Sequence, residues 1–214
     1  MKILAFVEGE GEQSALPTLL NRLHREACVH NEGRWNEPMI PLPPWKVGLD
    51  KLSDRTPLQK KIRDAFYVKD FDALLILVDA DDVCPRREIA ARISWVGAAC
   101  AGTPFAYVFA YREYESWFLA SMESLRGIAS IRPDAVSLDN PEEPRGAKER
   151  IEACMLLRRA TCYRETTHQK LLTASFDMAS AYRACRSFRK LVKAFGDLYR
   201  VHGKPIPHWP PSTW

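Results

Sequence analysis

Hydrophobic residues along the chain fall into short continuous runs that predict the strands of a sheet. Apolar runs occur at residues 3–7, 73–78 and 104–110, and each is rich in β-branched or aromatic residues. The run at 73–78 has no polar interruption, which is typical of a strand covered by helices on both faces of a parallel sheet. These three runs are therefore expected to form the centre of the sheet.

Amphipathic segments between the runs predict the connecting helices. Leucines recur at helical spacing within residues 12–27, a second helix is expected to start at Thr56, and residues 85–100 form a third. A weaker strand is expected near residues 39–42 or 45–47, inside a proline-rich loop. This alternation predicts an α/β fold with a mostly parallel four-stranded sheet flanked by helices.

The second half of the chain shows helical patterns and no further strand. The predicted helices cover residues 112–125, 147–160 and 174–195. A proline-rich loop is expected at 132–146, and the chain ends in a Pro/Trp-rich tail at 203–214. We therefore expect an α/β domain at residues 1–125, with a C-terminal helical cap and tail at 126–214 packed on it.

Composition narrows the class of protein further. With 214 residues, 46% hydrophobic and 27% charged, the chain can bury a core and does not resemble a disordered or coiled-coil sequence. The longest strongly apolar runs are five residues, whereas a membrane-spanning helix needs about 20. Glutamates follow the first run where a signal peptide would have a cleavage site, and the six cysteines contain no CxxC pair. We expect a cytoplasmic protein with reduced thiols that has no contact with a membrane.

Charge is distributed unevenly between the two halves. Residues 1–144 hold 17 basic and 22 acidic side chains, whereas residues 145–193 hold 12 basic and four acidic ones. An acidic half joined to a basic helical half is expected of a metal-dependent enzyme that acts on a polyanion. The alternative, equally compatible with charge alone, is that the basic residues only solvate amphipathic helices.

Acidic residues follow three of the predicted strands. Glu8 follows the first, Asp79 and Asp81 follow the run at 73–78, and Glu113 and Glu115 come shortly after the last strand. The carboxyl ends of parallel strands meet at one edge of a sheet, and residues two apart in an extended segment point the same way. Converging carboxylates repel each other unless a hard cation such as Mg²⁺ or Mn²⁺ lies between them. For any single acid, the alternative is a helix cap.

The motifs around these acids resemble those of a known domain. VEGEGE followed by LLILVDADD resembles the TOPRIM signature, in which a glutamate follows the first strand and an Asp-x-Asp follows the third. That domain occurs in topoisomerases, bacterial primases and overcoming-lysogenization-defect nucleases. With AYREYESWFLA, PRGAKERI and TASFDMASAYRACRSFRKL, most of the chain is similar to a bacterial TOPRIM-like family of unknown function. Its members are commonly encoded beside AAA- or ABC-type ATPases, often in anti-phage settings.

The resemblance implies roles for individual residues. Glu8 matches the TOPRIM glutamate, a general base or metal ligand, and Asp79 and Asp81 match the Asp-x-Asp that holds Mg²⁺. Glu12 matches the acidic residue that nuclease-type members carry shortly after that glutamate, whereas the RExE segment has no established role. The candidate metal ligands are Glu8, Glu12, Asp79, Asp81, Asp82, Glu113 and Glu115, and the candidate catalytic residues are Glu8, Asp79 and Asp81.

Three functions remain open from the sequence. The 214 residues hold neither the strand-passage domain of topoisomerases nor the zinc domain of primases, which favours a Mg²⁺- or Mn²⁺-dependent TOPRIM-type nuclease. Such a nuclease would be the effector of a bacterial defence or toxin-like system with an ATPase partner. The alternative is a regulatory subunit of an ATPase with a latent metal site. A third hypothesis is a phosphatase, because VDADDV fits the DxDx[TV] motif with Asp79 as nucleophile.

Basic residues are the candidate contacts to a DNA or RNA backbone. The candidates are Arg112, Lys148, Arg150, Arg164, His168, Lys170 and Arg189, with Arg158, Arg159 and the polar Gln169 beside them. Arg183, Arg186, Arg189, Lys190 and Lys193 repeat at three- to four-residue spacing and predict the basic outer face of an amphipathic helix. A solvated surface without a ligand is the alternative for all of these residues.

Overall fold

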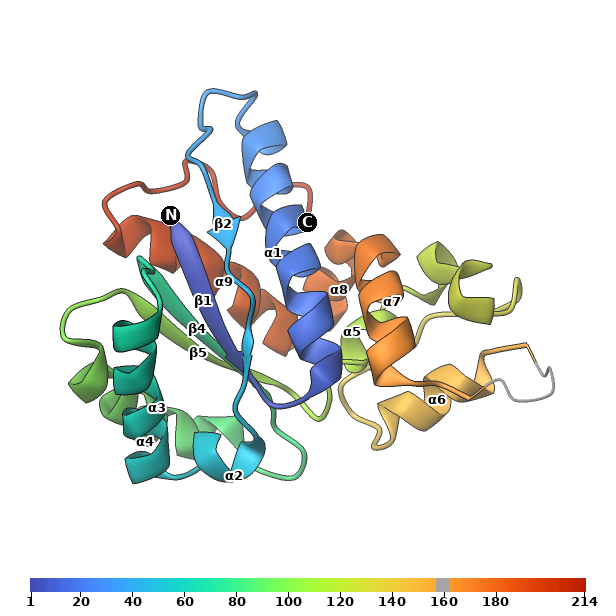
Figure 1. Cartoon of the computed structure of the whole chain (residues 1–214). Coiled ribbons are helices and arrows are strands. Elements are labelled where there is room, and N and C mark those ends of the chain that lie inside the picture. The colour runs from blue at the N-terminus through green and yellow to red at the C-terminus, as the bar shows by residue number, and fades with distance from the viewer. Residues whose placement is uncertain (157–161) are drawn as a thin grey trace.

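The computed structural model describes residues 1–156 and 162–214, and within them the chain forms a five-stranded, entirely parallel sheet (Figure 1). The strands are β1 (Lys2–Val7), β2 (Ile40–Pro41), β3 (Trp45–Lys46), β4 (Ala73–Asp79) and β5 (Phe105–Ala110). Their order is β2–β1–β4–β5. β2 pairs with the first residues of β1, Lys2 and Ile3, and β3 pairs with its last residues, Phe6 and Val7. The predicted α/β fold is confirmed, but both weak candidate strands form, so the predicted number of four strands was wrong.

Helices surround this sheet and make up most of the second half. In chain order they are α1 (Glu10–His30), α2 (Leu49–Leu52), α3 (Arg55–Val68), α4 (Pro85–Cys100), α5 (Ser116–Leu119), the 3₁₀ turns η1 (Met122–Leu125) and η2 (Ile128–Ser130), α6 (Ala147–Ala153), the π-helical turn η3 (Glu165–Gln169), α7 (Lys170–Ser175), α8 (Met178–Ala184) and α9 (Arg186–Val201). Within the described ranges, no helix is both long and apolar enough to cross a membrane.

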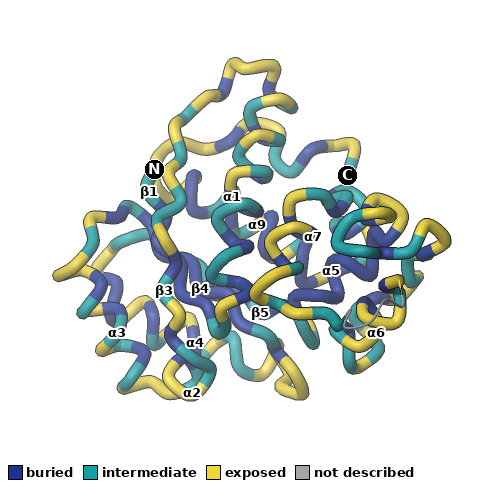
Figure 2. Tube along the Cα trace, turned by 45° about the vertical axis from the view of Figure 1, so that its right-hand side comes forward, coloured by how far each residue is buried: buried dark blue, intermediate teal, exposed yellow. Residues whose placement is uncertain are grey.

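The alternation of side chains along the strands builds two cores, one on each face of the sheet. In β1, Ile3 and Val7 point to the face covered by α1 and α9, whereas Leu4 and Phe6 point to the face covered by α3 and α4. All four side chains are fully buried, and Figure 2 shows the central strands β1 and β4 mostly in the colour of buried residues. The sheet is thus buried on both faces, as the apolar run of β4 predicted.

The C-terminal helices belong to one of these cores. Phe188 and Val192 of α9 are fully buried in the same cluster as Ile3 and the leucines of α1, and α9 packs on β5. α7 lies beside α1 in both Figure 1 and Figure 2 and packs against it. Residues 126–214 therefore share a hydrophobic core with the α/β part, and this core includes residues on both sides of the expected boundary at residue 125.

Several predicted helices differ from the observed ones. The helix expected at 112–125 is reduced to α5 and η1, because Tyr114, Trp117 and Phe118 are all fully buried and leave no polar face. The helix expected at 174–195 is split into α8, which Asp177 caps, and α9, because Cys185 is extended. The helix expected at 147–160 ends at residue 153, and residues 157–160, with Arg158 and Arg159, lie outside the described residues.

Candidate functional site

Carboxylates gather at the carboxyl ends of β1 and β4. These strands are parallel neighbours, with Val7 opposite Leu77, so Glu8 after β1 and Asp79 at the end of β4 reach the same edge of the sheet. α1 begins at this edge, at the bottom of Figure 1, and places Glu12 in its first turn. The backbone N–H of Gly9 donates to Glu12 Oε2 at 3.0 Å and fixes that side chain in a buried position.

Gly11 allows a second segment to approach the same edge. A Cβ atom at Gly11 would lie 1.9 Å from Gln169 Oε1 and 2.8 Å from Glu165 Cβ, so only glycine lets η3 pack against α1. The buried Gln169 donates through Nε2 to Glu12 Oε1 at 3.1 Å. η3 therefore contributes both Gln169 and Glu165 to the site, although no sequence motif indicated either residue.

Glu115 and Asp79 complete a group of four acids. The backbone N–H of Tyr114 donates to Asp79 Oδ1 at 2.9 Å, which positions Asp79 against the segment after β5. Glu115 has no solvent exposure, and its Oε1 accepts a hydrogen bond of 2.8 Å from the Tyr163 hydroxyl. We refer to Glu8, Glu12, Asp79 and Glu115 as the carboxylate cluster.

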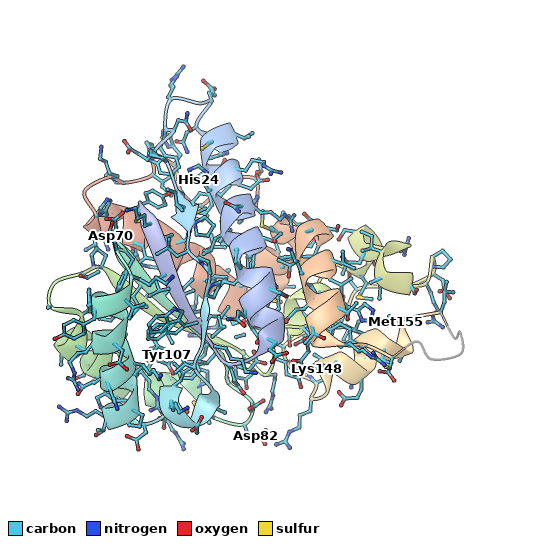
Figure 3. All side chains as sticks on the ribbon, in the orientation of Figure 1. His24, Asp70, Asp82, Tyr107, Lys148 and Met155 are labelled. Atoms are coloured by element: carbon cyan, nitrogen blue, oxygen red, sulfur yellow. The ribbon has the colours of Figure 1, made fainter. Side chains whose placement is uncertain are left out.

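Lys148 supplies positive charge to this cluster. Its Nζ lies 2.5 Å from Glu165 Oε1, and Glu115 and Asp79 also attract it. Burial lowers the pKa of Lys148, but the attraction of Glu115 and Glu165 outweighs burial, so the pKa stays above its usual value. Figure 3 shows Lys148 beside the start of α1. It was predicted as a nucleic-acid contact, and the structure places it among the acids.

The cluster nevertheless holds more negative charge than its environment stabilises. Burial, followed by repulsion from Asp81 and Glu12, raises the pKa of Glu8 to about 7. Burial also raises the pKa of Glu115 to about 7, against the opposing effects of Lys148 and Tyr163. The pKa of Asp79 is well above its usual range, because of burial and then repulsion from Glu115 and Glu12.

Two carboxylate oxygens of the cluster have no partner. Glu8 Oε2 and Glu115 Oε2 are both buried and accept no hydrogen bond from the described residues. A buried carboxylate oxygen without a donor is costly, which makes these two atoms the places where a cation would have most effect. In residues 1–156 and 162–214, however, no group of three or more His, Cys, Asp or Glu side chains is already arranged to hold a metal ion.

The remaining predicted ligands lie around the cluster. Asp81 is exposed, its backbone is in the left-handed region with φ of 46°, and its charge is close enough to Glu8 to add to burial in raising the pKa of that acid. Arg112 Nη1 donates to Asp81 O at 3.1 Å and to Asp82 Oδ1 at 2.9 Å, and Arg145 also pairs with Asp82 at 2.7 Å. Glu113 Oε2 accepts a hydrogen bond of 3.3 Å from the backbone N–H of Lys148. The side chains of Asp82 and Glu113 thus fasten loops around the cluster, and Arg112 does the same, whereas Asp81 takes part only through its backbone carbonyl oxygen.

The other predicted phosphate contacts lie in two places. Arg150, Arg164 and Lys170 are exposed on the segments that surround the cluster, and His168 Nδ1 accepts a hydrogen bond of 2.9 Å from the backbone N–H of Arg164. Arg189 lies on α9, among the basic residues of that helix. Tyr163 and Glu165 are the site residues that sequence reasoning missed, and Gln169, expected beside a phosphate, contacts Glu12 instead.

Comparison with known proteins gives one family. Residues 7–195 match the family model described as "Domain of unknown function (DUF4276)", a range that runs from the end of β1 into α9 and contains the whole carboxylate cluster. No curated protein and no solved structure matches the chain. Because the family model covers most of the sequence, the chain belongs to the DUF4276 family.

Proposed function

We propose that this protein is a divalent-metal-dependent enzyme that hydrolyses phosphodiester bonds in nucleic acid. The supporting observation is the carboxylate cluster, in which four acids meet at the carboxyl ends of two parallel strands. Two of their buried oxygens lack partners, and the pKa values of Glu8 and Glu115 are raised to about 7. In open α/β sheets, this edge is where ligands bind.

The donor set fits a hard divalent cation. Glu8, Asp79 and Glu115 offer carboxylate oxygens, which Mg²⁺ and Mn²⁺ prefer, and the unpartnered oxygens of Glu8 and Glu115 are available to one. A bound ion would neutralise charge on a phosphodiester and lower the pKa of a coordinated water. The TOPRIM resemblance supports this assignment for Glu8 and Asp79, and we extend it to Glu115.

The side chains themselves suit the proton transfer and charge stabilisation that hydrolysis requires. With a pKa of about 7, Glu8 accepts a proton near neutral pH, as a general base does when water attacks phosphorus. The Lys148 ammonium keeps its charge and faces the phosphate as negative charge develops there. Tyr163 and Gln169 act as positioning residues, because they hold Glu115 and Glu12 by hydrogen bonds.

A cleavage assay tests this function. Labelled single-stranded DNA, duplex DNA and RNA are incubated with Mg²⁺ or Mn²⁺ and with the wild type, Asp79→Asn, Glu8→Gln or Glu10→Gln. Glu10 is the matched control, because it lies two residues from Glu8 but is exposed and pairs with Lys46. We expect Asp79→Asn and Glu8→Gln to lose cleavage by about 10²-fold or more, and Glu10→Gln to retain it. Equal cleavage by wild type and Asp79→Asn would contradict the proposal.

A second candidate function is a regulatory subunit of an ATPase with a latent site. The observation in its favour is Lys148, which partly neutralises the cluster without a metal, together with the absence of a ready metal arrangement in the described residues. The ATPase partner, like a role in defence, rests on the sequence resemblance. Cleavage that occurs only after addition of an AAA- or ABC-type ATPase would favour the second candidate.

A further inference from the structure

A basic hollow lies along α9, away from the carboxylate cluster. Its volume is about 580 Å³, and it lies between α9 and the C-terminal tail. Its lining includes the cations Arg186, Arg189, Lys190, Lys193 and Arg200, with Trp209 on the side of the tail. We call this hollow the α9 groove.

The charges in the α9 groove are largely uncompensated. Asp197 is the acid that lines it, and it already pairs with Lys193 at 2.5 Å and Arg200 at 3.1 Å. Arg186 and Lys190 are exposed and form no ion pair with a carboxylate in the described part of the chain. Five cations against one acid favour a ligand with several negative charges.

One of these cations is held in position by the protein. Arg189 is half-buried, and its Nη1 donates to the carbonyl oxygens of Tyr182 at 2.8 Å and Arg183 at 2.7 Å, near the end of α8. A guanidinium fixed in this way loses little conformational freedom when it binds a ligand. The groove is therefore partly pre-organised, unlike a surface of freely moving lysines.

The tail forms a fixed wall of the groove. Trp209 Nε1 donates to the carbonyl oxygen of Val192 at 2.8 Å, and its ring packs against Phe195. A Cβ atom at Gly196 would lie 2.4 Å from Trp209 Cδ1, so the glycine lets the tail lie directly on α9. Figure 1 shows the tail following α9 at the C-terminal end of the chain.

The spacing of the cations suits an extended polyanion. Arg186, Lys190 and Lys193 lie on one face of α9, one per turn, which corresponds to about 5.4 Å along the helix axis. The opposite face is buried against the sheet. A single nucleic-acid strand carries one negative charge per nucleotide along a flexible backbone, and a positively charged groove that follows the backbone is how such strands are bound.

A second hollow connects the groove with the edge of the sheet. It has a volume of about 650 Å³ and shares Arg186 and Lys190 with the α9 groove. Its lining also includes Cys84 and Tyr111, from the loops after β4 and β5, and the acids Glu142 and Glu143. Glu142 is occupied by hydrogen bonds from the backbone N–H groups of Arg186 and Ser187 at 2.7 and 2.8 Å. Tyr111 is 37% exposed, and an exposed aromatic ring of this kind can stack on a base.

We propose that the α9 groove binds the backbone of single-stranded nucleic acid. The strand continues through the second hollow towards the carboxylate edge, and this part of the inference rests on the proposed function. An acidic protein segment is the competing ligand. The row of cations, with an exposed aromatic ring farther along the same path, favours the nucleic acid.

Binding of a labelled oligonucleotide in EDTA tests the proposal without any cleavage. Fluorescence anisotropy with a single-stranded 16-mer is measured against salt concentration for the wild type and for Arg186→Glu/Lys190→Glu. We expect at least a tenfold loss of affinity at about 0.1 M salt. The plot of the logarithm of the association constant against the logarithm of the salt concentration has a negative slope. Its magnitude is expected to decrease by about 1.4, because each phosphate contact on a single strand contributes about 0.7.

A matched control keeps this result specific. Lys60→Glu/Arg63→Glu makes the same change of charge at exposed positions of α3, on the other face of the sheet, and is expected to bind like the wild type. Equal affinity of the two double variants would overturn the proposal. Displacement of the oligonucleotide by polyglutamate at the same charge concentration would also overturn it, in favour of an acidic protein. Binding in EDTA that depends on α9 would stand even if no cleavage is found.

Discussion

The carboxylate cluster and the α9 groove carry opposite charges in opposite settings. Glu115 in the cluster is completely buried, whereas Arg186 and Lys190 in the groove are exposed to water. Burial raises the pKa of the acids, because a charge taken out of water is costly unless it is paired. The exposed cations carry no such cost.

This difference shows which charges are coupled to the stability of the fold. Changes in the cluster should alter the free energy of unfolding and should respond to pH and to divalent cations. Changes in the groove should alter binding and leave the free energy of unfolding nearly constant.

The largest effect is expected for Lys148→Met. Removal of this cation leaves Glu115 and Glu165 without it, so we expect the free energy of unfolding in EDTA at pH 8 to fall by about 2–3 kcal/mol. Millimolar Mg²⁺ should restore most of this loss, because the ion neutralises the same carboxylates. Urea denaturation measures both effects. The control is Lys170→Met, which changes an exposed lysine nearby and should alter the free energy of unfolding by less than about 0.5 kcal/mol.

Gly11→Ala tests the packing that brings η3 to the cluster. The new methyl group would collide with Gln169 and with Glu165. We therefore expect the free energy of unfolding to fall by about 1–3 kcal/mol and metal binding to weaken. Gly97→Ala in α4 is the control, since its Cβ would only touch Phe105 at 3.4 Å and alanine favours a helix. An unchanged free energy of unfolding for Gly11→Ala in urea denaturation would show that η3 is not held against α1.

Stability should fall as pH rises through the range in which the cluster ionises. Glu8 and Glu115 have pKa values of about 7 in the folded protein and about 4.5 when unfolded, so the folded state binds more protons between these values. In EDTA, the free energy of unfolding should fall between pH 5 and pH 8 by on the order of 2 kcal/mol for each of these two groups. Glu115→Gln should flatten this dependence, whereas Glu10→Gln should follow the wild type; identical pH profiles for all three would contradict the account.

Asp79→Asn is expected to separate stability from function. An asparagine Oδ1 can still accept the hydrogen bond from Tyr114, while the substitution removes one of four mutually repelling charges. We therefore expect the free energy of unfolding of the metal-free protein to increase by about 1 kcal/mol, and metal binding to be lost. A clear decrease in thermal stability in EDTA would mean that the charge of Asp79 stabilises the fold.

The smallest effect on stability is expected in the α9 groove. Arg186→Glu/Lys190→Glu changes exposed residues without ion-pair partners in the described part of the chain, so the free energy of unfolding should stay within about 0.5 kcal/mol. The same variant is expected to lose oligonucleotide binding. A loss of stability above 1 kcal/mol in urea denaturation would show that these cations serve the fold.

Local sequence patterns predicted the central strands and helices well. α4 has its predicted bounds, 85–100, and the bounds of β4 and β5 are within one residue of the predicted ones. The hydrophobic periodicity and the residues that start and end these elements all lie within each segment. Glu8 and Asp79 were correctly placed at one edge, because parallel pairing of buried strands follows from their apolar runs. The sequence thus contained the position of the site.

Long-range packing determined the rest, which the sequence did not reveal. Asp81 was expected in an extended segment after Asp79, but β4 ends at Asp79 and the chain turns at Asp81 with φ of 46°, although the charge of Asp81 still acts on Glu8. Gln169 reaches the cluster through η3, whose position depends on Gly11, more than 150 residues away, and Tyr163 reaches Glu115 from the segment before η3. No local periodicity records such a contact.

Binding of Mn²⁺ to the purified protein, followed by electron paramagnetic resonance, shows whether the carboxylate cluster holds a metal ion. It needs no substrate and no partner, and it compares the wild type with Asp79→Asn and with Glu10→Gln. The account predicts bound Mn²⁺ in the wild type and in Glu10→Gln and its loss in Asp79→Asn. No binding at millimolar Mn²⁺, or equal binding by all three proteins, would contradict the assignment of the carboxylate cluster as a metal site.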